Sequence, residues 1–219
     1  MVDTTLLAQV DFFRVFSEDA FKAVASEVEV RSLDRGDVLF EEGDEAAELF
    51  VVEHGRIAIA NRSADGRESV FALMEPGDLF GEMPLFDGEG RSAAARALEP
   101  SRVYALAYAS LREVLTERPE LLWGVVELLS RRLRMVDAAL ADSMFLDVTG
   151  RTAKRLLELA GANDEFQLPV TQEELAGMVG ASRERVNKAI SSFVRLGWIE
   201  QRDRRYVITD REQLTRRAR

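Results

Sequence analysis

Residues 119–144, PELLWGVVELLSRRLRMVDAALADSM, decide the fold. Apolar side chains recur in this stretch at steps of three and four, the spacing of one face of an α-helix. The first apolar row consists of Leu122, Val126, Leu129, Leu133, Val136 and Leu140, and a second row beside it consists of Leu121, Val125 and Leu128. The predicted helix therefore has two faces to bury. We expect one face to pack on its own chain and the other on a second copy; the alternative is a core helix of one large domain.

Composition narrows the classes of function. The chain has 219 residues, is 47% hydrophobic, and contains no Cys and a single His, His54. This length suffices for one or two hydrophobic cores. The absence of Cys excludes Cys-ligated zinc, iron–sulfur clusters and a catalytic thiol, and a single His excludes a His-rich metal site. No run of apolar residues approaches the length of a transmembrane helix, and residues 1–9 lack the basic flank of a secretory signal. We therefore expect a cytoplasmic protein with no membrane partner.

Net charge differs between the two ends of the chain. The 29 Lys and Arg residues against 39 Asp and Glu residues give a net charge of −10, which by itself argues against nucleic-acid binding. Residues 1–144 hold 15 of the basic and 28 of the acidic residues, whereas residues 145–219 hold 14 and 11. A nucleic-acid partner is therefore expected at the C-terminal side. We interpret its most basic segment, REQLTRRAR at 211–219, as a solvated tail.

The segment before the long helix predicts a helical lead-in and an all-β domain. Helical spacing covers residues 6–21, and from 28 to about 107 short apolar runs of period two alternate with glycine-bearing turns such as Asp65-Gly66. Glycine allows the sharp reversals that such turns need. This spacing predicts a roll or barrel of about eight short strands. We interpret His54 as an exposed turn residue; the alternative is a haem ligand.

One connection, DLFGEMPLFDGEGRSAAARA at 78–97, is longer than a simple turn. Gly81 and the small residues near it allow backbone N–H groups to approach a ligand closely. Arg91 and Ser92 offer a guanidinium and a hydroxyl to one phosphate, and Glu82 offers an acceptor for a sugar hydroxyl. We therefore expect a phosphate cradle here; the alternative is an Arg-Ser pair solvated in a loop.

The segment FGEMPLFDGEGRSAAARA resembles the phosphate-binding cassette of cyclic-nucleotide-binding domains, whose pattern is Gly-Glu, a spacer, then Arg-Ser/Thr-Ala. The resemblance covers roughly residues 28–107. It implies that Arg91 pairs with the cyclic phosphate and that Glu82 accepts from the ribose 2′-hydroxyl. It also implies that phosphate contacts come from Ser92 and the backbone near Ala93, close backbone approach from Gly81, and an apolar wall from Met83.

Beyond the long helix, residues 145–151, FLDVTGR, indicate a hinge that leads into an amphipathic helix ending at Gly161. The segment TQEELAGMVGASRERVNKAISSFVRLGWIE at 171–200 then predicts a helix-turn-helix. Thr171 and Glu174 form a capping box, and Gly180 makes the turn. The predicted second helix has an apolar face of Val186, Ile190 and Phe193 and a polar face of Arg183, Glu184, Asn187 and Lys188.

The polar face of this second helix has the side chains of a DNA reader. Arg183 can bond a guanine edge bidentately, Glu184 can accept from a cytosine amino group, and Lys188 can reach a second guanine. Runs at 197–199 and 206–208 predict the two strands of a wing. Phosphate contacts that set register without reading sequence are expected from Thr171, Gln172, Ser182 and Arg202. The alternative is an exposed charged helix face.

The segment ASRERVNKAI also resembles the recognition helix of the CRP/FNR family of transcription regulators, and FLDVTGR resembles the hinge of that family. The likeness covers nearly the whole chain and is strongest to the cyclic-AMP receptor branch. It implies an α+β fold: a cyclic-nucleotide-binding β-roll with its lead-in at 1–109, a dimerisation helix and hinge at 110–146, and a winged helix-turn-helix at 147–219. The reading residues would recognise a TGTGA-like half-site, with Lys188 replacing the Arg of some members.

The dimer helix departs from the family at two positions. Cyclic-AMP-responsive members usually carry Thr followed by Ser or Asn to hold the adenine from both subunits, where this chain has Val136 and Asp137. Val136 has no hydroxyl, whereas an ionised Asp137 accepts hydrogen bonds and repels guanine O6. We therefore expect cAMP to be preferred over cGMP, with Arg132 adding a charge contact. The alternative for Asp137 is an ion pair with Arg134.

Together these features predict a homodimeric transcription regulator that binds double-stranded DNA, is controlled by a cyclic nucleotide and acts on RNA polymerase. The nucleotide is an effector, and we expect neither a cofactor nor an enzymatic activity. One rival is a regulator that binds DNA without cyclic nucleotide or responds to another ligand. A second rival is a nucleotide phosphodiesterase, which the lack of a metal-ligand cluster argues against.

Overall fold

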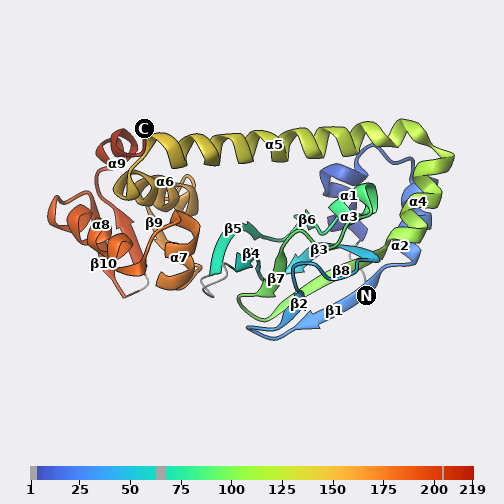
Figure 1. The fold of residues 1–219 in the computed structure, drawn as a ribbon, viewed down its shortest axis with the longest axis horizontal. Helices are drawn as coiled ribbons and strands as arrows, with labels where there is room; N and C mark the ends of the chain where they lie inside the picture. Colours follow the sequence, from blue (N-terminus) through green and yellow to red (C-terminus); the bar gives the residue numbers. More distant parts are fainter. Residues whose placement is uncertain (1–3, 63–67, 204) are drawn as a thin grey trace. The chain divides into compact units, whose positions relative to one another are not determined.

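The computed structural model describes residues 4–62, 68–203 and 205–219. By their contacts the residues divide into two compact units: unit 1 is 1–61 with 71–134, and unit 2 is 62–70 with 135–219. The division falls inside helix α5 (Leu122–Phe145), which Figure 1 shows as one continuous helix. The predicted long helix is therefore confirmed. The predicted turn Asp65-Gly66 lies outside the described residues.

A roll of two four-stranded sheets, with the strand orders β1-β8-β3-β6 and β2-β7-β4-β5, belongs to unit 1 except for residue 62 of β4 and residues 68–70 of β5 (Figure 1). The described strands thus match the expected roll of short strands. Their bounds are β1 Glu29–Leu33, β2 Val38–Phe40, β3 Glu48–His54, β4 Ile57–Arg62, β5 Glu68–Met74, β6 Leu79–Phe80, β7 Ala94–Ala97 and β8 Ser101–Ala107. His54 ends β3 and is exposed, as the turn interpretation predicted.

Strand β3 separates two apolar cores. Successive side chains of a strand point to opposite faces. Leu49 and Val51 accordingly belong to a core shared with the helices, whereas Phe50 and Val52 belong to the core between the two sheets. In that inner core, Phe40, Phe50 and Phe80 stack with ring centroids 5.5–6.2 Å apart. Because both of its faces are buried, β3 lacks the alternation of apolar and polar residues that marks a half-exposed strand.

Short helices surround the roll in unit 1. The predicted helical lead-in is confirmed as α1 (Thr4–Gln9), η1 (Asp11–Phe13) and α2 (Glu18–Ser26), the last capped by Ser17. Further along the chain come α3 (Met83–Asp87), α4 (Tyr108–Glu117) and η2 (Pro119–Leu121).

The two apolar rows of the long helix behave differently. In the second row, Leu121 and Val125 are 3% and 4% exposed. Val125 belongs to the core shared with the helices, against which Leu128 also packs, and Leu121 belongs to a small cluster with Ala20 and Leu115. In the first row, by contrast, Leu133 and Val136 are 61% and 63% exposed, and the remaining members, Leu122, Val126, Leu129 and Leu140, are also exposed. The expectation that one face packs on its own chain is therefore confirmed. None of the helices in the described ranges is long and apolar enough to cross a membrane.

Unit 2 is a helical unit with a small sheet in the order β10-β11-β9. Its elements after α5 are α6 Val148–Ala160, β9 Glu165–Gln167, α7 Gln172–Val179, α8 Arg183–Arg195, β10 Ile199–Arg202, β11 Arg205–Ile208 and α9 Arg211–Arg217. The two predicted wing strands are present, but the first was predicted at 197–199 and is found as β10 at Ile199–Arg202, while β11 contains the predicted 206–208. Strand β9 pairs with β11 as a third strand.

The helix-turn-helix forms where the capping residues predict it. The Thr171 hydroxyl accepts from the Glu174 N–H at 3.2 Å, and the Glu174 carboxylate accepts from the Thr171 N–H at 2.7 Å, which completes the capping box. Gly180 ends α7 with φ +68°, a left-handed conformation that favours glycine. Ser182 caps α8. The predicted inner residues Leu175, Ala176, Val179, Val186, Ile190 and Phe193 are all buried.

The interpretation of residues 211–219 as a solvated tail is wrong. Most of this segment forms α9, which packs against α6 and buries Leu214 completely. Arg211 donates to Asp164 at 2.8 Å and to the carbonyl of Asn163 at 2.7 Å. The error arises because the segment contains one strongly apolar side chain among four arginines and other polar residues, so its sequence carries no amphipathic period.

Helix α9 also reaches the start of α6. Asp147 caps α6 by accepting from the Gly150 N–H at 2.8 Å, and Arg217 pairs with the same carboxylate. This backbone hydrogen bond, together with Arg217, lowers the pKa of Asp147. A side chain at Gly150 would place its Cβ 3.0 Å from the Arg217 carbonyl oxygen, so glycine permits the close approach of α9.

We predict that Leu214→Ala destabilises unit 2 by about 2–5 kcal/mol, because it leaves a cavity at a fully buried site. Unfolding in urea should be followed by Trp198 fluorescence, since this indole stacks on Phe193 with centroids 5.7 Å apart. The background should carry Trp123→Phe, because Trp123 is the other tryptophan of the chain. Arg216→Ala, at an exposed position of the same helix, should change stability by less than about 0.5 kcal/mol. Equal effects of the two substitutions would show that α9 is not packed.

Candidate functional site

The predicted phosphate cradle is a loop fastened at both ends. After β6, Gly81 adopts φ +75°, α3 ends at Gly88 in a left-handed conformation, and the loop then returns into β7. The Gly43 N–H donates to the Arg91 carbonyl at 2.8 Å, and the Arg91 N–H donates to the Asp44 carbonyl at 2.9 Å. These paired bonds hold Arg91 in place from the backbone.

The Arg91 side chain is turned inward and is 6% exposed. Its Nη1 donates to the Gly81 carbonyl at 2.9 Å and to the Tyr108 hydroxyl at 3.2 Å, and its Nη2 donates to the Glu48 carbonyl at 2.8 Å. The guanidinium lies 4.1 Å from the centroid of the Phe40 ring. Burial lowers the pKa of Arg91, although an arginine stays protonated at any physiological pH.

The Arg91 guanidinium has N–H donors that remain available to a ligand. A guanidinium carries five N–H donors, and the bonds above use three of them. Nε is buried and has no partner among the described residues. Arg91 therefore retains the Nε donor and one donor on Nη2, enough for a two-point contact with an anion.

Gly81 and Tyr108 also fix the position of the Arg91 guanidinium. A Cβ at Gly81 would lie 2.6 Å from Arg91 Nη1, so any other residue there would displace the charge. The Tyr108 hydroxyl donates to the Gly81 carbonyl, and burial raises the pKa of Tyr108. Tyr108 was not predicted from the sequence, because its position at the start of α4 is remote from the cassette and carries no local signal.

Glu82 lies beside this seat and is 1% exposed. Its Oε1 accepts from Arg132 of α5, which also donates to the Leu79 carbonyl. Its Oε2 is buried without a partner in the described part of the chain. Arg132, expected to contact a ligand, is thus placed at the cradle but bonded to Glu82.

The remaining candidates of the cradle fall into two groups. Ser92 is exposed, with its Oγ 3.5 Å from the sulfur of Met83, and Ala93 is buried. Val136 and Asp137 are exposed residues of unit 2, one turn beyond Arg132 on the same helix. Over the described residues no ion pair joins Asp137 to its nearby arginine Arg134.

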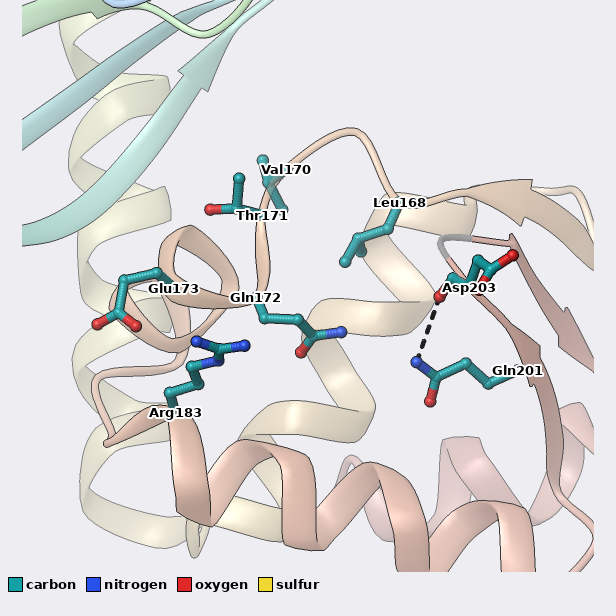
Figure 2. A pocket seen from close by; sticks show the side chains of 8 residues that line it. All are labelled: Leu168, Val170, Thr171, Gln172, Glu173, Arg183, Gln201 and Asp203. Carbon is teal, nitrogen blue, oxygen red and sulfur yellow. Dashed lines mark hydrogen bonds between the residues drawn. The ribbon is translucent and has the colours of Figure 1, made fainter.

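The candidate DNA-binding residues gather partly around a pocket of about 370 Å³ in unit 2. Figure 2 shows Gln172 and Arg183 lining it from the first turns of α7 and α8, with Gln201 and Asp203 of the wing opposite. The Gln172 Nε2 donates to the Tyr206 hydroxyl at 2.8 Å. Thr171 and Glu173 also line the pocket, whereas Arg202 does not and is 85% exposed at its side chain.

The outer face of α8 is cationic. Arg183 and Lys188 are exposed, and their side chains make no ion pair with a described residue. Ser182 and Glu184 lie on the same exposed face, and Asn187 is half-buried between its neighbours. The structure therefore brings the five candidates of α8 together on one face.

A second pocket of about 460 Å³ adds residues that the sequence did not single out. It lies between the first turn of α6 and the outer side of α8, with Thr149, Arg185 and Arg195 joining Lys188 in its lining. Arg185 and Arg195 could have been found from their helical spacing with Lys188. Thr149 could not, because it comes from a different helix.

Two family models match the two units. Residues 30–118 match the cyclic nucleotide-binding domain, and residues 150–217 match the Crp-like helix-turn-helix domain. The first match contains Gly81, Glu82 and Arg91, and the second contains the outer face of α8.

Known proteins resemble the chain over most of its length. It is 38% identical over 221 residues to a CRP-like cAMP-activated global transcriptional regulator of Mycobacterium tuberculosis, which covers 98% of this chain and 99% of the relative. The cAMP-activated global transcriptional regulator Vfr of Pseudomonas aeruginosa is 34% identical, over 76% of this chain and 82% of Vfr. Among solved structures, the c-di-GMP responsive global regulator CLP of Xanthomonas campestris has a TM-score of 0.76 at 25% identity, covering 88% of this chain and 99% of that one.

Proposed function

Because this chain belongs to the CRP/FNR family of DNA-binding transcription regulators, we propose that it acts as a homodimer whose cradle binds cAMP and whose α8 helices read a palindromic DNA site. The family consists of regulators rather than enzymes, so binding the nucleotide changes geometry and involves no covalent step. We propose double-stranded DNA and RNA polymerase as its partners and the cytoplasm as its location. We also keep the three-part division at 1–109, 110–146 and 147–219 as a proposal.

The observation that carries the proposal is a pair of unpartnered atoms in the cradle. Arg91 Nε is a buried donor and Glu82 Oε2 is a buried acceptor, and neither has a hydrogen-bond partner in the described ranges. Leaving such groups unsatisfied is costly. A cyclic phosphate supplies acceptors and a ribose 2′-hydroxyl supplies a donor. A 3′,5′-cyclic nucleotide therefore satisfies both atoms together.

The charge of Arg91 supports the same ligand. All three acceptors of its guanidinium are neutral, two carbonyls and one hydroxyl. A buried cation without a carboxylate partner stabilises an anion placed against it. Ser92 and the backbone near Ala93 would add hydrogen bonds to the phosphate, Gly81 leaves room for the guanidinium, and Met83 would cover the ligand.

Adenine is the base that the dimer helix favours. Asp137 is exposed and accepts hydrogen bonds when ionised, so it would accept from the adenine amino group and repel guanine O6. Val136 supplies an apolar contact without a hydroxyl. Arg132, bonded to Glu82, would link the ribose end of the ligand to α5.

The exposed apolar row of α5 supports the homodimer. Six apolar side chains along one face of this helix, from Leu122 to Leu140, are between 37% and 63% exposed. Burying such a row against its own copy is the arrangement that a helical seam with this spacing favours. Two copies would then hold two α8 helices about one DNA turn apart.

Helix α8 supports the DNA-reading role. We propose that Arg183, Glu184 and Lys188 read the base edges of a TGTGA-like half-site, with Asn187 alongside. Phosphate contacts would come from Thr171, Gln172, Ser182 and Arg202, and from Thr149, Arg185 and Arg195 of the second pocket.

A second candidate is a regulator that responds to another ligand or binds DNA without one. It is favoured by Val136 and Asp137, which replace the Thr and the Ser or Asn of cAMP-responsive members, and by the similarity to CLP, a c-di-GMP responsive regulator. Calorimetry on nucleotide-free protein with cAMP, cGMP and c-di-GMP decides between the candidates. Heat from cAMP alone supports the first; heat only from c-di-GMP, or from none of the three, supports the second.

We predict that Arg91→Leu weakens cAMP binding at least roughly a hundredfold, because two charge-assisted hydrogen bonds worth about 1.5–3 kcal/mol each are lost. Calorimetry measures the affinity, and size-exclusion chromatography should show an unchanged dimer. Arg102→Leu is the matched control, since it removes the same charge from a half-exposed position of β8. Undiminished affinity in the Arg91 variant would refute the cradle assignment.

We predict that Leu133→Glu yields a monomer, because the dimer would have to bury two unpaired carboxylates in an apolar seam. Sedimentation velocity measures the mass in solution. Ala138→Glu adds the same charge at an exposed position on the opposite side of α5 and should leave the dimer intact. A wild-type chain that is monomeric at concentrations where it binds DNA specifically would rule out the homodimer.

We predict that Arg183→Ala removes about 1–3 kcal/mol of discrimination between a TGTGA-like site and random DNA. Weak, salt-sensitive binding should remain, because phosphate contacts are unaffected. Fluorescence anisotropy on both DNAs at several salt concentrations measures the ratio. Arg195→Ala is the comparison: it should weaken both complexes alike and reduce the salt slope by about one. Equal losses on both DNAs in the Arg183 variant would contradict its reading role.

A further inference from the structure

Asn61 is a polar residue on an apolar wall. It belongs to β4, where Ile57 is fully buried in the core between the sheets and Ile59 packs against that core. Because side chains alternate along a strand, Asn61 lies on the same face as these two isoleucines. Its Oδ1 is buried and has no hydrogen-bond partner among the residues that the structure describes.

The register of the sheet places Asn61 next to the cradle. Strand β4 pairs with β7 in an antiparallel register that aligns Ile59 with Ala95 and Ala60 with Ala94. Extended by one residue beyond β7, this register would bring Asn61 opposite Ala93, the last residue of the Arg-Ser-Ala pattern of the cassette. The core that Ile59 packs against also includes Phe40, whose ring lies under the Arg91 guanidinium.

We propose that Asn61 is a specificity-determining residue that reads the purine base of the nucleotide bound in the cradle. This inference rests on the proposed function. It concerns the purine base, which the cradle residues do not contact in that proposal. A carboxamide presents one acceptor and two donors side by side. The Hoogsteen edge of adenine matches it with the N6 amino donor and the N7 acceptor, whereas guanine presents two acceptors, O6 and N7.

The unpartnered oxygen determines which part of the base is read. Oδ1 accepts from the adenine N6 amino group, which satisfies a buried atom that has no hydrogen bond from any described residue. The contact comes from the same subunit as the cradle. Selection of adenine by Asn61 is therefore independent of Asp137 on the dimer helix.

The test compares two ligands that differ only at the 6-position. Calorimetry on nucleotide-free protein measures the affinity for cAMP and for 3′,5′-cyclic purine riboside monophosphate, which lacks the amino group. Wild-type protein should bind cAMP roughly tenfold more tightly. In Asn61→Leu, an apolar side chain of similar size, this preference should fall to the part that the Asp137 contact supplies. Asn61→Ala provides a second variant in case the first does not fold.

Two results would overturn the inference and leave the cradle intact. The first is a wild-type protein that binds both ligands equally well, and the second is a preference for cAMP that is undiminished in the Asn61 variants and disappears only in Asp137→Ala. In either case, loss of binding in Arg91→Leu still supports the proposed function. A wild-type protein that binds neither ligand overturns the proposed function, and the role of Asn61 with it.

Discussion

The structure depends on a helix that has two apolar rows, one buried and one exposed among the described residues. Val125 of the second row is buried against the roll, whereas Leu133 and the other members of the first row face solvent. A row of this length cannot be buried by local rearrangement, because a helix is rigid and the neighbouring row is already packed. The ion pair between Arg132 and Glu82 joins the same helix to the cradle. A partner that packs on the exposed row would therefore contact the same helix that the Arg132–Glu82 ion pair joins to the cradle.

The cradle is organised around a buried positive charge. Arg91 is held by neutral acceptors and an aromatic ring, and this arrangement seats the guanidinium without neutralising it. The neighbouring carboxylate, Glu82, is paired with Arg132 through one oxygen only. The roll therefore presents the preorganised Arg91 guanidinium beside the Glu82 carboxylate, whose Oε2 has no partner among the described residues. Preorganisation of this kind lowers the entropic cost of binding, because the side chains are already fixed before the ligand arrives.

In unit 2, side chains of α6 and α9 bind the segment that connects α5 to α6. Arg151 donates to the Leu146 carbonyl at 2.7 Å and to the Val179 carbonyl at 2.9 Å, which joins the end of α5 to the end of α7. Arg217 of α9 holds Asp147, the cap of α6. The C-terminal helix is therefore part of the frame that positions α8, although its sequence resembles a soluble tail.

The sequence by itself determined the elements whose signals are local: the period of the long helix, the glycine turns of the roll, the capping box of α7 and the cassette that contains Glu82 and Arg91. Local signals suffice there because backbone conformation and capping depend on residues a few positions apart. Only the tertiary structure decided which apolar row of α5 is buried, that Tyr108 seats Arg91, that Arg132 bonds Glu82, and that α9 packs through Leu214. Each of these depends on contacts between segments far apart in the chain, and no spacing within one segment records such contacts.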